Sequence, residues 1–305
     1  MTDVHTHRAQ VTISAGTDRV VLVGTPSPLR SAVARELRAS AALLACLDGP
    51  ACLPRALPAV ATDGGAGLGG ATVVFATVPR LPGLVSGLRH WCRSAALAAD
   101  FSRAVTAARK HGAARIIVLS TAFRYDDDRG LALYPGSPTL TAAETAQAAA
   151  AEAGAHLFSR LGGESVVLRL GWTCGREDAV TRRVASAARR GWRLVDADPA
   201  AWVAMITEAD AARAVRPALT VPPGIYNVTD GCPVTQGVLN ARLEAAAGQA
   251  LHGLDDPRWS YHGALFGRSR KITGTAFGAL TGWRPQAAPA ADSLAAMVSG
   301  PAAPR

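Results

Sequence analysis

The chain has 305 residues, of which 49% are hydrophobic and only 5% aromatic, and its formal net charge is +9. This length suits one large α/β domain or two smaller ones, with enough chain to bury a full core. Arginine carries almost all of the positive charge, because Lys110 and Lys271 are the only lysines, and no nucleic-acid-binding motif accompanies it. We therefore expect a globular protein without a nucleic-acid partner.

The five cysteines are odd in number and form no CxxC pair, and the histidines have no ligand-like spacing. This pattern favours a reducing cytoplasm over a disulfide framework and predicts no metal site. No apolar run approaches the ~20 residues of a membrane helix, so we expect no membrane partner. Residues 1–17 lack the basic head and apolar block of a signal peptide and read as a flexible arm.

From residue 18 onward, candidate strands and helices alternate. The run RVVLVG is continuously apolar and β-branched, which suits a strand buried on both faces. The alternation predicts a doubly wound parallel sheet, a Rossmann-like fold with ligands at the carboxyl ends of the strands. The expected strands are 19–24, 42–48, 56–63, 71–78, 114–121 and 164–172, and the expected helices are 31–40, 91–111 and 139–153.

The pattern loosens in the second half. We expect helices at 177–191 and 235–247, a strand at 224–229 and a weakly held terminus beyond 286. This divides the chain into a Rossmann-like domain, 18–175, and a mainly substrate-binding lobe, 176–305, whose strand 224–229 returns to the sheet. The helix 177–191 is rich in arginine and presents either a solvated face or a patch for a phosphorylated small molecule.

Several segments, in this order, resemble the extended short-chain dehydrogenase/reductases, the NAD-dependent epimerase/dehydratase group. They are RVVLVGTPSPLRSAVAREL, ATVVFATV, RIIVLSTAFRY, VVLRLGWTCG, GIYNVTDGCPVT and RKITGTAFGALTGWRP. The resemblance covers residues 19 to 285 and implies a Rossmann-like fold, an NAD(P) cofactor and a small-molecule substrate. It also implies a homodimer that pairs through helices 91–111 and 139–153.

The cofactor loop departs from this family. The family's Gly-x-x-Gly-x-x-Gly lets backbone amides approach a pyrophosphate at a helix N-terminus. Here the three positions hold Gly24, Ser27 and Arg30, and Pro26 and Pro28 remove two N–H donors from the loop. The substitutions favour weakened or lost pyrophosphate binding, although the charge of Arg30 could instead neutralise a phosphate.

Asp48 falls where the family often places an acid on the adenosine ribose, which would favour NAD over NADP. The pair Asp48-Gly49 is also a common turn, so both interpretations stay open. A second string, GAGLGG at 65–70, matches GxGxxG but runs directly into a strand instead of opening a helix. We interpret it as a turn.

The catalytic pair is also missing. The resemblance places the family's Tyr-x-x-x-Lys at Glu144 and Ala148, and an alanine cannot lower the pKa of a proton donor. Glu144 is either an acid/base group with a raised pKa or an idle replacement on the helix surface. Thr121 falls on the family's Ser/Thr that hydrogen-bonds substrate, or is only a threonine at the end of a strand, and Tyr125 falls on a tyrosine that is usually structural.

Four residues are expected to contact substrate. Trp172 ends the strand 164–172, Thr173 and Arg176 follow it, and Trp202 belongs to the predicted lobe. Trp172 would form a wall on which a flat substrate stacks, although an apolar lid explains the tryptophans equally well. Cys174 has no assignable base, so we interpret it as a small buried residue.

These replacements lead to three hypotheses. The first is an atypical biosynthetic enzyme that catalyses a non-redox step, an elimination, isomerisation or cyclisation, with Glu144 as acid/base and Thr121 and Tyr125 orienting the substrate. The second is an NAD(P)-dependent reductase or epimerase with a different proton relay. The third is a non-catalytic ligand sensor or scaffold, because a fold alone does not choose among activities.

Overall fold

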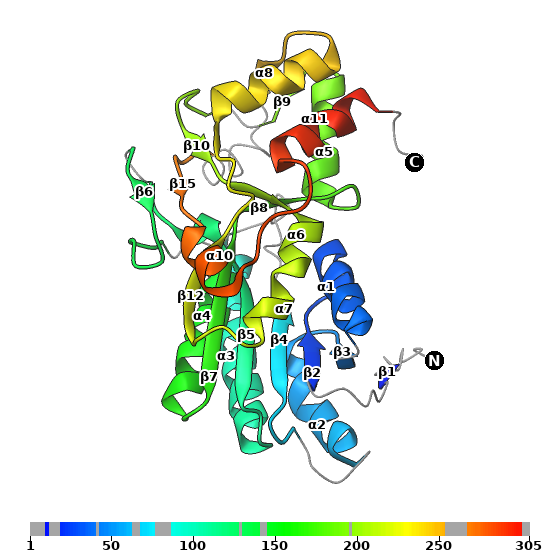
Figure 1. Cartoon of the computed structure of the whole chain (residues 1–305), viewed down its shortest axis with the longest axis vertical. Coiled ribbons are helices and arrows are strands. Elements are labelled where there is room, and N and C mark those ends of the chain that lie inside the picture. The colour runs from blue at the N-terminus through cyan, green and yellow to red at the C-terminus, as the bar shows by residue number, and fades with distance from the viewer. Residues whose placement is uncertain are drawn as a thin grey trace.

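The computed structural model describes residues 10–11, 19–40, 43–62, 68–76, 87–127, 130–140, 145–194, 197–253 and 267–300. The molecule is elongated, with a layered sheet domain at one end of its long axis and a helical lobe at the other (Figure 1). The fold is the Rossmann-like α/β fold that the alternation of strands and helices predicts.

The central sheet has the strand order β1-β3-β2-β4-β5-β7-β12, and every pair except β1–β3 is parallel. All four residues of β2 are buried, because helices cover both faces of the sheet. The strands are β1 (Gln10–Val11), β2 (Val20–Val23), β3 (Leu43–Leu47), β4 (Thr72–Ala76), β5 (Arg115–Thr121), β7 (Glu164–Leu170) and β12 (Gly224–Val228).

Two layers of helices sandwich the sheet. One face carries α1 (Pro28–Ala39), α6 (Glu208–Arg213) and α7 (Val215–Ala218). The other carries α2 (Leu53–Thr62), α3 (Gly87–Lys110) and α4 (Ala146–Arg160). Ala150, Ala151 and Ala155 of α4 are buried in this second layer. The homodimer expected from the resemblance stays a prediction.

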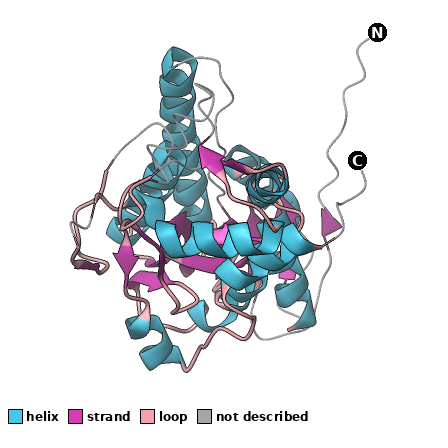
Figure 2. Ribbon diagram, turned by 90° about the horizontal axis from the view of Figure 1, so that it is seen from above, coloured by secondary structure: helices cyan, strands magenta, loops and turns pink. Residues whose placement is uncertain are grey.

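The lobe lies beyond the carboxyl ends of the sheet strands and is seen end-on in Figure 2. Its core joins α5 (Ala179–Arg189), α8 (Gln236–Ala247) and α11 (Ala290–Ser299). Short strands connect it to the sheet domain: β8 (Trp172–Cys174) runs parallel to β11 (Met205–Thr207), and β10 (Trp202–Val203) pairs with β13 (Val234–Thr235).

The remaining described elements are short. A projecting arm contains β6 (Ala132–Leu133), which pairs with β15 (Lys271–Ile272), and β9 (Trp192–Arg193) pairs with β14 (His252–Gly253). The others are η1 (Pro50–Cys52), η2 (Ala122–Arg124) and α10 (Thr275–Thr281). The strand expected at 224–229 is β12, so the second half of the chain does return to the sheet.

The strand predicted at 56–63 is wrong, because residues 56–62 belong to helix α2. Leu53 and Leu57 stand one helical turn apart, and both are buried. Their spacing and the alanines around them fit a helix better than a strand, in which β-branched residues are enriched. The edge beyond β3 is taken instead by Gln10 and Val11 of β1, so part of the predicted flexible arm is paired with the sheet.

The weakly held terminus beyond 286 is also wrong, because α11 packs against α5 and α8. Ala290, Leu294 and Val298 recur every four residues and are buried. The Arg189 guanidinium donates to the last carbonyls of the helix, those of Met297 and Val298, where a positive charge complements the helix dipole.

Truncating Leu294 tests whether this helix belongs to the core. Leu294 is 0% exposed, so Leu294→Ala should lower the free energy of unfolding by about 2–5 kcal/mol, measured by urea denaturation. The matched control is Leu280→Ala, whose side chain is 59% exposed and whose loss should cost about 0.5 kcal/mol or less. Equal effects of the two variants would contradict the packing of α11.

Candidate functional site

The chain reverses its direction across the sheet at β2. It leaves β2, forms β3 on one side and then returns to form β4 on the other. Parallel sheets bind ligands outside the carboxyl ends of the strands at such a switch point. The loop from β2 to α1, with Gly24 and Ser27, and the first turn of α1, with Arg30, therefore lie where the fold places a dinucleotide.

Gly24 is retained in this loop for a packing reason. Its N–H donates to the carbonyl of Leu47 at 2.9 Å, and a Cβ at this position would collide with the carbonyl oxygen of Ala76. The Ser27 hydroxyl caps α1 by accepting the N–H of Arg30 at 3.1 Å. Ser27 therefore satisfies a helix-terminal donor that a phosphate would otherwise accept from.

Arg30 and Asp48, the two charged candidates for cofactor binding, pair with each other. An Nη of Arg30 lies 3.0 Å from a carboxylate oxygen of Asp48, and the two side chains are 14% and 36% exposed. The acid that would hold a ribose and the cation that would hold a phosphate thus neutralise one another. Pro26 in the loop and Pro28 at the start of α1 also lack an N–H donor, so these residues do not fit a dinucleotide in the way that the family's glycine loop does.

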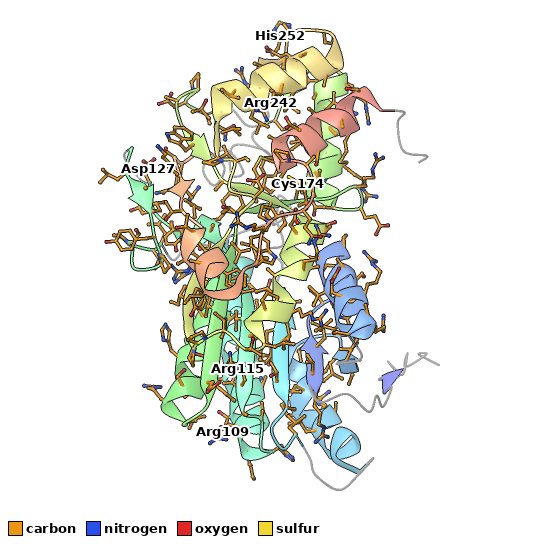
Figure 3. The ribbon with its side chains drawn as sticks, viewed as in Figure 1. Arg109, Arg115, Asp127, Cys174, Arg242 and His252 are labelled. Atoms are coloured by element: carbon orange, nitrogen blue, oxygen red, sulfur yellow. The ribbon has the colours of Figure 1, made fainter. Side chains whose placement is uncertain are left out.

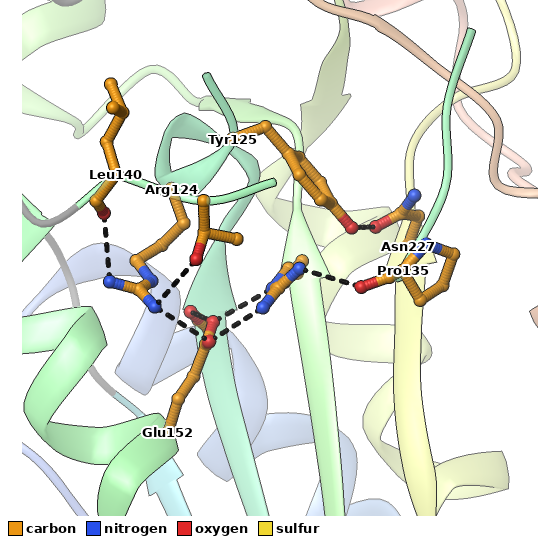
Figure 4. A network of polar contacts seen from close by, with 9 residues as sticks. Arg124, Tyr125, Pro135, Leu140, Glu152 and Asn227 are labelled. Atoms are coloured by element: carbon orange, nitrogen blue, oxygen red, sulfur yellow. Dashed lines mark hydrogen bonds and ion pairs between the residues drawn. The ribbon is translucent and has the colours of Figure 1, made fainter. Parts of the chain in front are cut away.

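The helix expected to carry the catalytic pair begins later than predicted, at Ala146 instead of 139. Glu144 lies outside the described residues. Ala148, at the position of the family's lysine, is 3% exposed, so its methyl group is enclosed by protein. One turn further along the same face, Glu152 points into the interior of the protein and forms the centre of a polar network (Figure 4).

Glu152 is buried between two guanidinium groups. Arg169 on β7 donates from Nε and Nη2 to its two carboxylate oxygens, at 3.0 and 2.8 Å. Ser120 on β5 donates to Oε1 at 2.6 Å, and Arg124 lies 3.5 Å from Oε2. The Arg169 guanidinium and these hydrogen bonds hold the pKa of Glu152 below its ordinary value, although burial opposes them. The carboxylate is therefore a fixed structural charge.

Tyr125 belongs to the same network. Its side chain is fully buried, and its hydroxyl donates to Oδ1 of Asn227 on β12 at 2.5 Å. The Arg169 guanidinium lies over its ring, 4.7 Å from the centroid. Burial raises the pKa of Tyr125. In this structure the tyrosine hydroxyl is engaged by the fold and ties β12 to the end of β5.

Thr121 lies at the carboxyl end of β5 and is also buried. Its Oγ1 accepts the N–H of Phe123 at 3.2 Å and so caps the turn η2. A threonine hydroxyl that accepts in this way still has a proton to donate. The side chain is thus held at the ligand-facing edge of the sheet in a defined orientation.

A small cleft opens beside this edge, between the sheet domain and the lobe, with a volume of about 10 Å³, room for about one water molecule. Phe123, Trp172 and Trp202 contribute aromatic walls, and Arg268 and Arg270 contribute cations. Two predicted substrate-contacting residues, Trp172 and Trp202, therefore meet in one cleft. Arg268 and Arg270 were missed, although the run Arg268-Ser269-Arg270-Lys271 is a visible charge cluster next to the closing motif.

The other two predicted substrate residues are not among the residues that line this cleft. Thr173 is half-buried and pairs with Ile206 across β8 and β11, and Arg176 is exposed. Beyond them, burial and the charges of Asp178 and Glu177 raise the pKa of Glu208 to about 7. Its carboxylate packs onto Gly175, where a Cβ would collide with it.

The described residues contain no group of three or more His, Cys, Asp or Glu side chains placed to hold a metal ion. Cys174 is buried, and burial raises the pKa of its thiol well above the ordinary value. Figure 3 shows it at the junction of lobe and sheet domain. Within the described part of the chain, no helix has the length and apolar character needed to span a membrane.

No protein-family model matches the sequence, and no curated protein matches it. Solved structures do match. The UDP-glucose 4-epimerase of Thermus thermophilus, in complex with NAD, aligns with a TM-score of 0.71 and 20% identity over 92% of this chain and 98% of the epimerase. MoeE5 with UDP-glucose and NAD aligns at 0.69 and 16% over 92% and 97%. RMD from Pseudomonas aeruginosa with NADPH aligns at 0.67 and 17% over 93% and 98%.

This chain has the epimerase/dehydratase fold. The alignments run over nearly the full length of both partners, so the lobe as well as the sheet is shared. The resemblance stated from the sequence motifs is confirmed at the level of the fold. The replaced glycine loop and catalytic pair mark the chain as a divergent form of it.

Removing the buried charge of Glu152 tests the network. Glu152→Gln leaves the Arg169 and Arg124 guanidiniums without their buried counter-charge and should lower the free energy of unfolding by about 3–5 kcal/mol at neutral pH. Because the folded pKa of Glu152 lies below its ordinary 4.5, its contribution is complete above that pH and is lost as the pH falls through the lowered value. The gap between wild type and variant should therefore narrow below pH 4.5.

The measurement is urea denaturation of both proteins at neutral pH and at several pH values below 4.5. The control is Glu164→Gln, which removes a carboxylate that is 53% exposed and pairs with Arg115. This substitution should cost about 1 kcal/mol or less. A Glu152→Gln effect no larger than that of the control would show that the buried charge is dispensable.

Proposed function

We propose that this protein is an atypical enzyme of the epimerase/dehydratase fold that converts a small molecule by acid/base chemistry without hydride transfer. The reaction class is an elimination, isomerisation or cyclisation. The observation that carries the proposal is the ion pair between Arg30 and Asp48, which joins the two charged groups on which a dinucleotide site would depend.

A second observation supports the loss of redox chemistry. Hydride transfer needs a proton relay as well as a bound nicotinamide. Ala148 is enclosed where the family's lysine would stand, and the next polar group on that face of α4, Glu152, is committed to Arg169. The two elements of family chemistry are therefore replaced at separate places, in the loop after β2 and on α4.

The proposal assigns the acid/base role to Glu144 and the positioning of substrate to Thr121. Glu144 stands four residues before Ala148, at the position of the family's proton donor. A carboxyl group in a partly buried cleft can reach a pKa suited to proton transfer at neutral pH. Thr121 supplies a hydroxyl at the carboxyl end of β5, and Trp172 a wall for the substrate.

The fold itself favours the competing function, an NAD(P)-dependent reductase or epimerase. The epimerase from Thermus thermophilus and MoeE5 are described in complex with NAD, and RMD with NADPH. In this alternative a ligand would break the Arg30–Asp48 pair and use both side chains. The two functions make opposite predictions for nucleotide binding.

Calorimetric titration with NAD+, NADH, NADP+ and NADPH separates them. We expect no saturable binding to this protein at millimolar nucleotide, because Asp48 is neutralised and the segment lacks two of the three glycines and two of the N–H donors of a phosphate cradle. The Thermus thermophilus epimerase, titrated in the same way with NAD+, is the positive control. Micromolar binding, weakened by Asp48→Asn, would overturn the proposal in favour of redox chemistry.

Replacing Glu144 tests the acid/base assignment. Sugar nucleotides and small aromatic acids are incubated with the wild type, and products are detected by mass spectrometry. Glu144→Gln should abolish conversion of any substrate so found while leaving the thermal unfolding temperature unchanged, because the amide cannot exchange a proton. The control is Glu164→Gln, at the amino end of β7 and so at the edge of the sheet that faces away from the ligand site. It should retain full activity. Full activity of Glu144→Gln would show that the assignment is wrong.

A further inference from the structure

We propose that Glu208 is a pH-sensitive contact between the sheet domain and the lobe. With its carboxyl group protonated, Glu208 packs against the loop at Gly175 and holds the two parts of the molecule together. With the carboxyl group ionised, the acids of that loop repel it and the contact loosens. This contact is separate from the residues of the proposed function, so the two can fail independently.

The strand register brings Glu208 and the Gly175 loop together. β11 runs parallel to β8, and Thr207 at the end of β11 pairs with Cys174 at the end of β8. Glu208 and Gly175, the residues that follow these strands, therefore lie side by side. The carboxyl group of Glu208 fills the space over Gly175, because a Cβ on this glycine would collide with it. The two segments are thus in direct contact without a side chain between them.

The contact joins two separate cores. Glu208 is the first residue of α6, whose Ala211 and Ala212 belong to the core of the sheet domain. Gly175 leads into α5, which Asp178 caps and which belongs to the core of the lobe. Figure 1 shows α6 beside α1, at the level where the lobe meets the sheet domain. A change of charge at Glu208 therefore acts on the junction of the two parts.

Charges of its own sign dominate around Glu208. Glu177 and Asp178 act on it from the connection between β8 and α5, and the exposed Arg35 opposes them from α1. Among the described residues, its carboxyl group has no hydrogen-bond or ion-pair partner. Burial and the two acids raise its pKa to about 7, although Arg35 lowers it. Glu208 therefore changes its charge near neutral pH, without a partner that would hold it ionised.

The other charged and titratable groups beside Glu208 keep their state near neutral pH. The Cys174 thiol on β8 stays protonated, because burial raises its pKa well above the ordinary value. On α6, burial opposes the ionisation of Asp210, but the backbone N–H of Gln286 and the Arg213 guanidinium hold its pKa below the ordinary value. Arg176, the cation of the Gly175 loop, is exposed and stays charged.

The sign of the pH effect follows from the pKa of Glu208. This pKa is about 7 in the closed junction and returns toward the ordinary 4.5 when the junction opens to water. The closed form therefore holds the proton more tightly, and its advantage is complete below pH 4.5. As the pH rises from 4.5 to 7, opening becomes easier by up to about tenfold per pH unit, and it levels off above 7.

Hydrogen–deuterium exchange of the full chain measures this opening. The reporters are the backbone N–H of Asp178, which donates to the carbonyl of Gly175 at 3.1 Å, and that of Thr181, which donates to Oδ2 of Asp178 at 2.7 Å. Between about pH 6 and pH 8, after division by the intrinsic exchange rates, their protection should fall about tenfold in the wild type. In Glu208→Gln, whose amide does not ionise, it should be equal at both pH values.

Glu164→Gln is the matched control. It removes a carboxylate that pairs with Arg115 at the amino end of β7, so it should keep the fall seen in the wild type. Thermal unfolding establishes that each variant is folded. Constant protection in the wild type, or an equal fall in Glu208→Gln, would overturn the proposal.

Carbon-13 NMR of the glutamate carboxyl groups titrates Glu208 directly, with its signal assigned by its absence in Glu208→Gln. We expect a midpoint at about pH 7. Asp178→Asn keeps a capping side chain but loses a negative charge, so it should move the midpoint down. Arg35→Gln removes the opposing cation and should move it up. A midpoint near 4.5 in the wild type, or shifts of the same sign in the two variants, would overturn the proposal.

Discussion

The structure depends most on one buried carboxylate. Glu152 on α4 joins that helix to β5 through Ser120 and to β7 through Arg169. Arg169 in turn lies over Tyr125, whose hydroxyl reaches Asn227 on β12. A charge taken out of water is costly unless it is paired and hydrogen-bonded, so each member of this set requires the others. The network therefore fixes the helix and the strand ends that face the cleft.

Because of this network, the residues that hold the fold together differ from the residues at the family's catalytic positions. The network uses α4 one turn beyond Ala148, so the helix can stay in register after its catalytic pair is replaced. After β2 the family's residues are replaced in a different way. Arg30 and Asp48 form an ion pair that is partly exposed, so a ligand could separate them. The Glu152 network on α4 therefore holds the fold together, whereas Arg30 and Asp48 form a neutralised pair at the ligand-facing edge of the sheet.

Much of the fold follows from sequence. The runs VVLV of β2, IIVL within β5 and VVL within β7 are continuous and apolar, and such runs indicate strands buried on both faces. The errors arose where local composition is ambiguous, as in the leucine- and alanine-rich segment of α2 and the Pro/Ala-rich approach to α11. The Arg30–Asp48 pair was not predicted, because each residue was interpreted against a ligand and not against the other.

Arg169 did carry a signal that sequence reasoning did not use. A charged residue in the middle of the apolar strand VVLRL must find a partner, and the two glutamates of the predicted alanine-rich helix, Glu144 and Glu152, were candidates for it. The arginines of the cleft lack such a signal, because Arg268 and Arg270 follow no regular period and meet Trp202 only through tertiary contacts. A charged residue within an apolar strand pattern therefore predicts a buried ion-pair partner, whereas the sequence pattern does not predict which residues line the cleft between the sheet domain and the lobe.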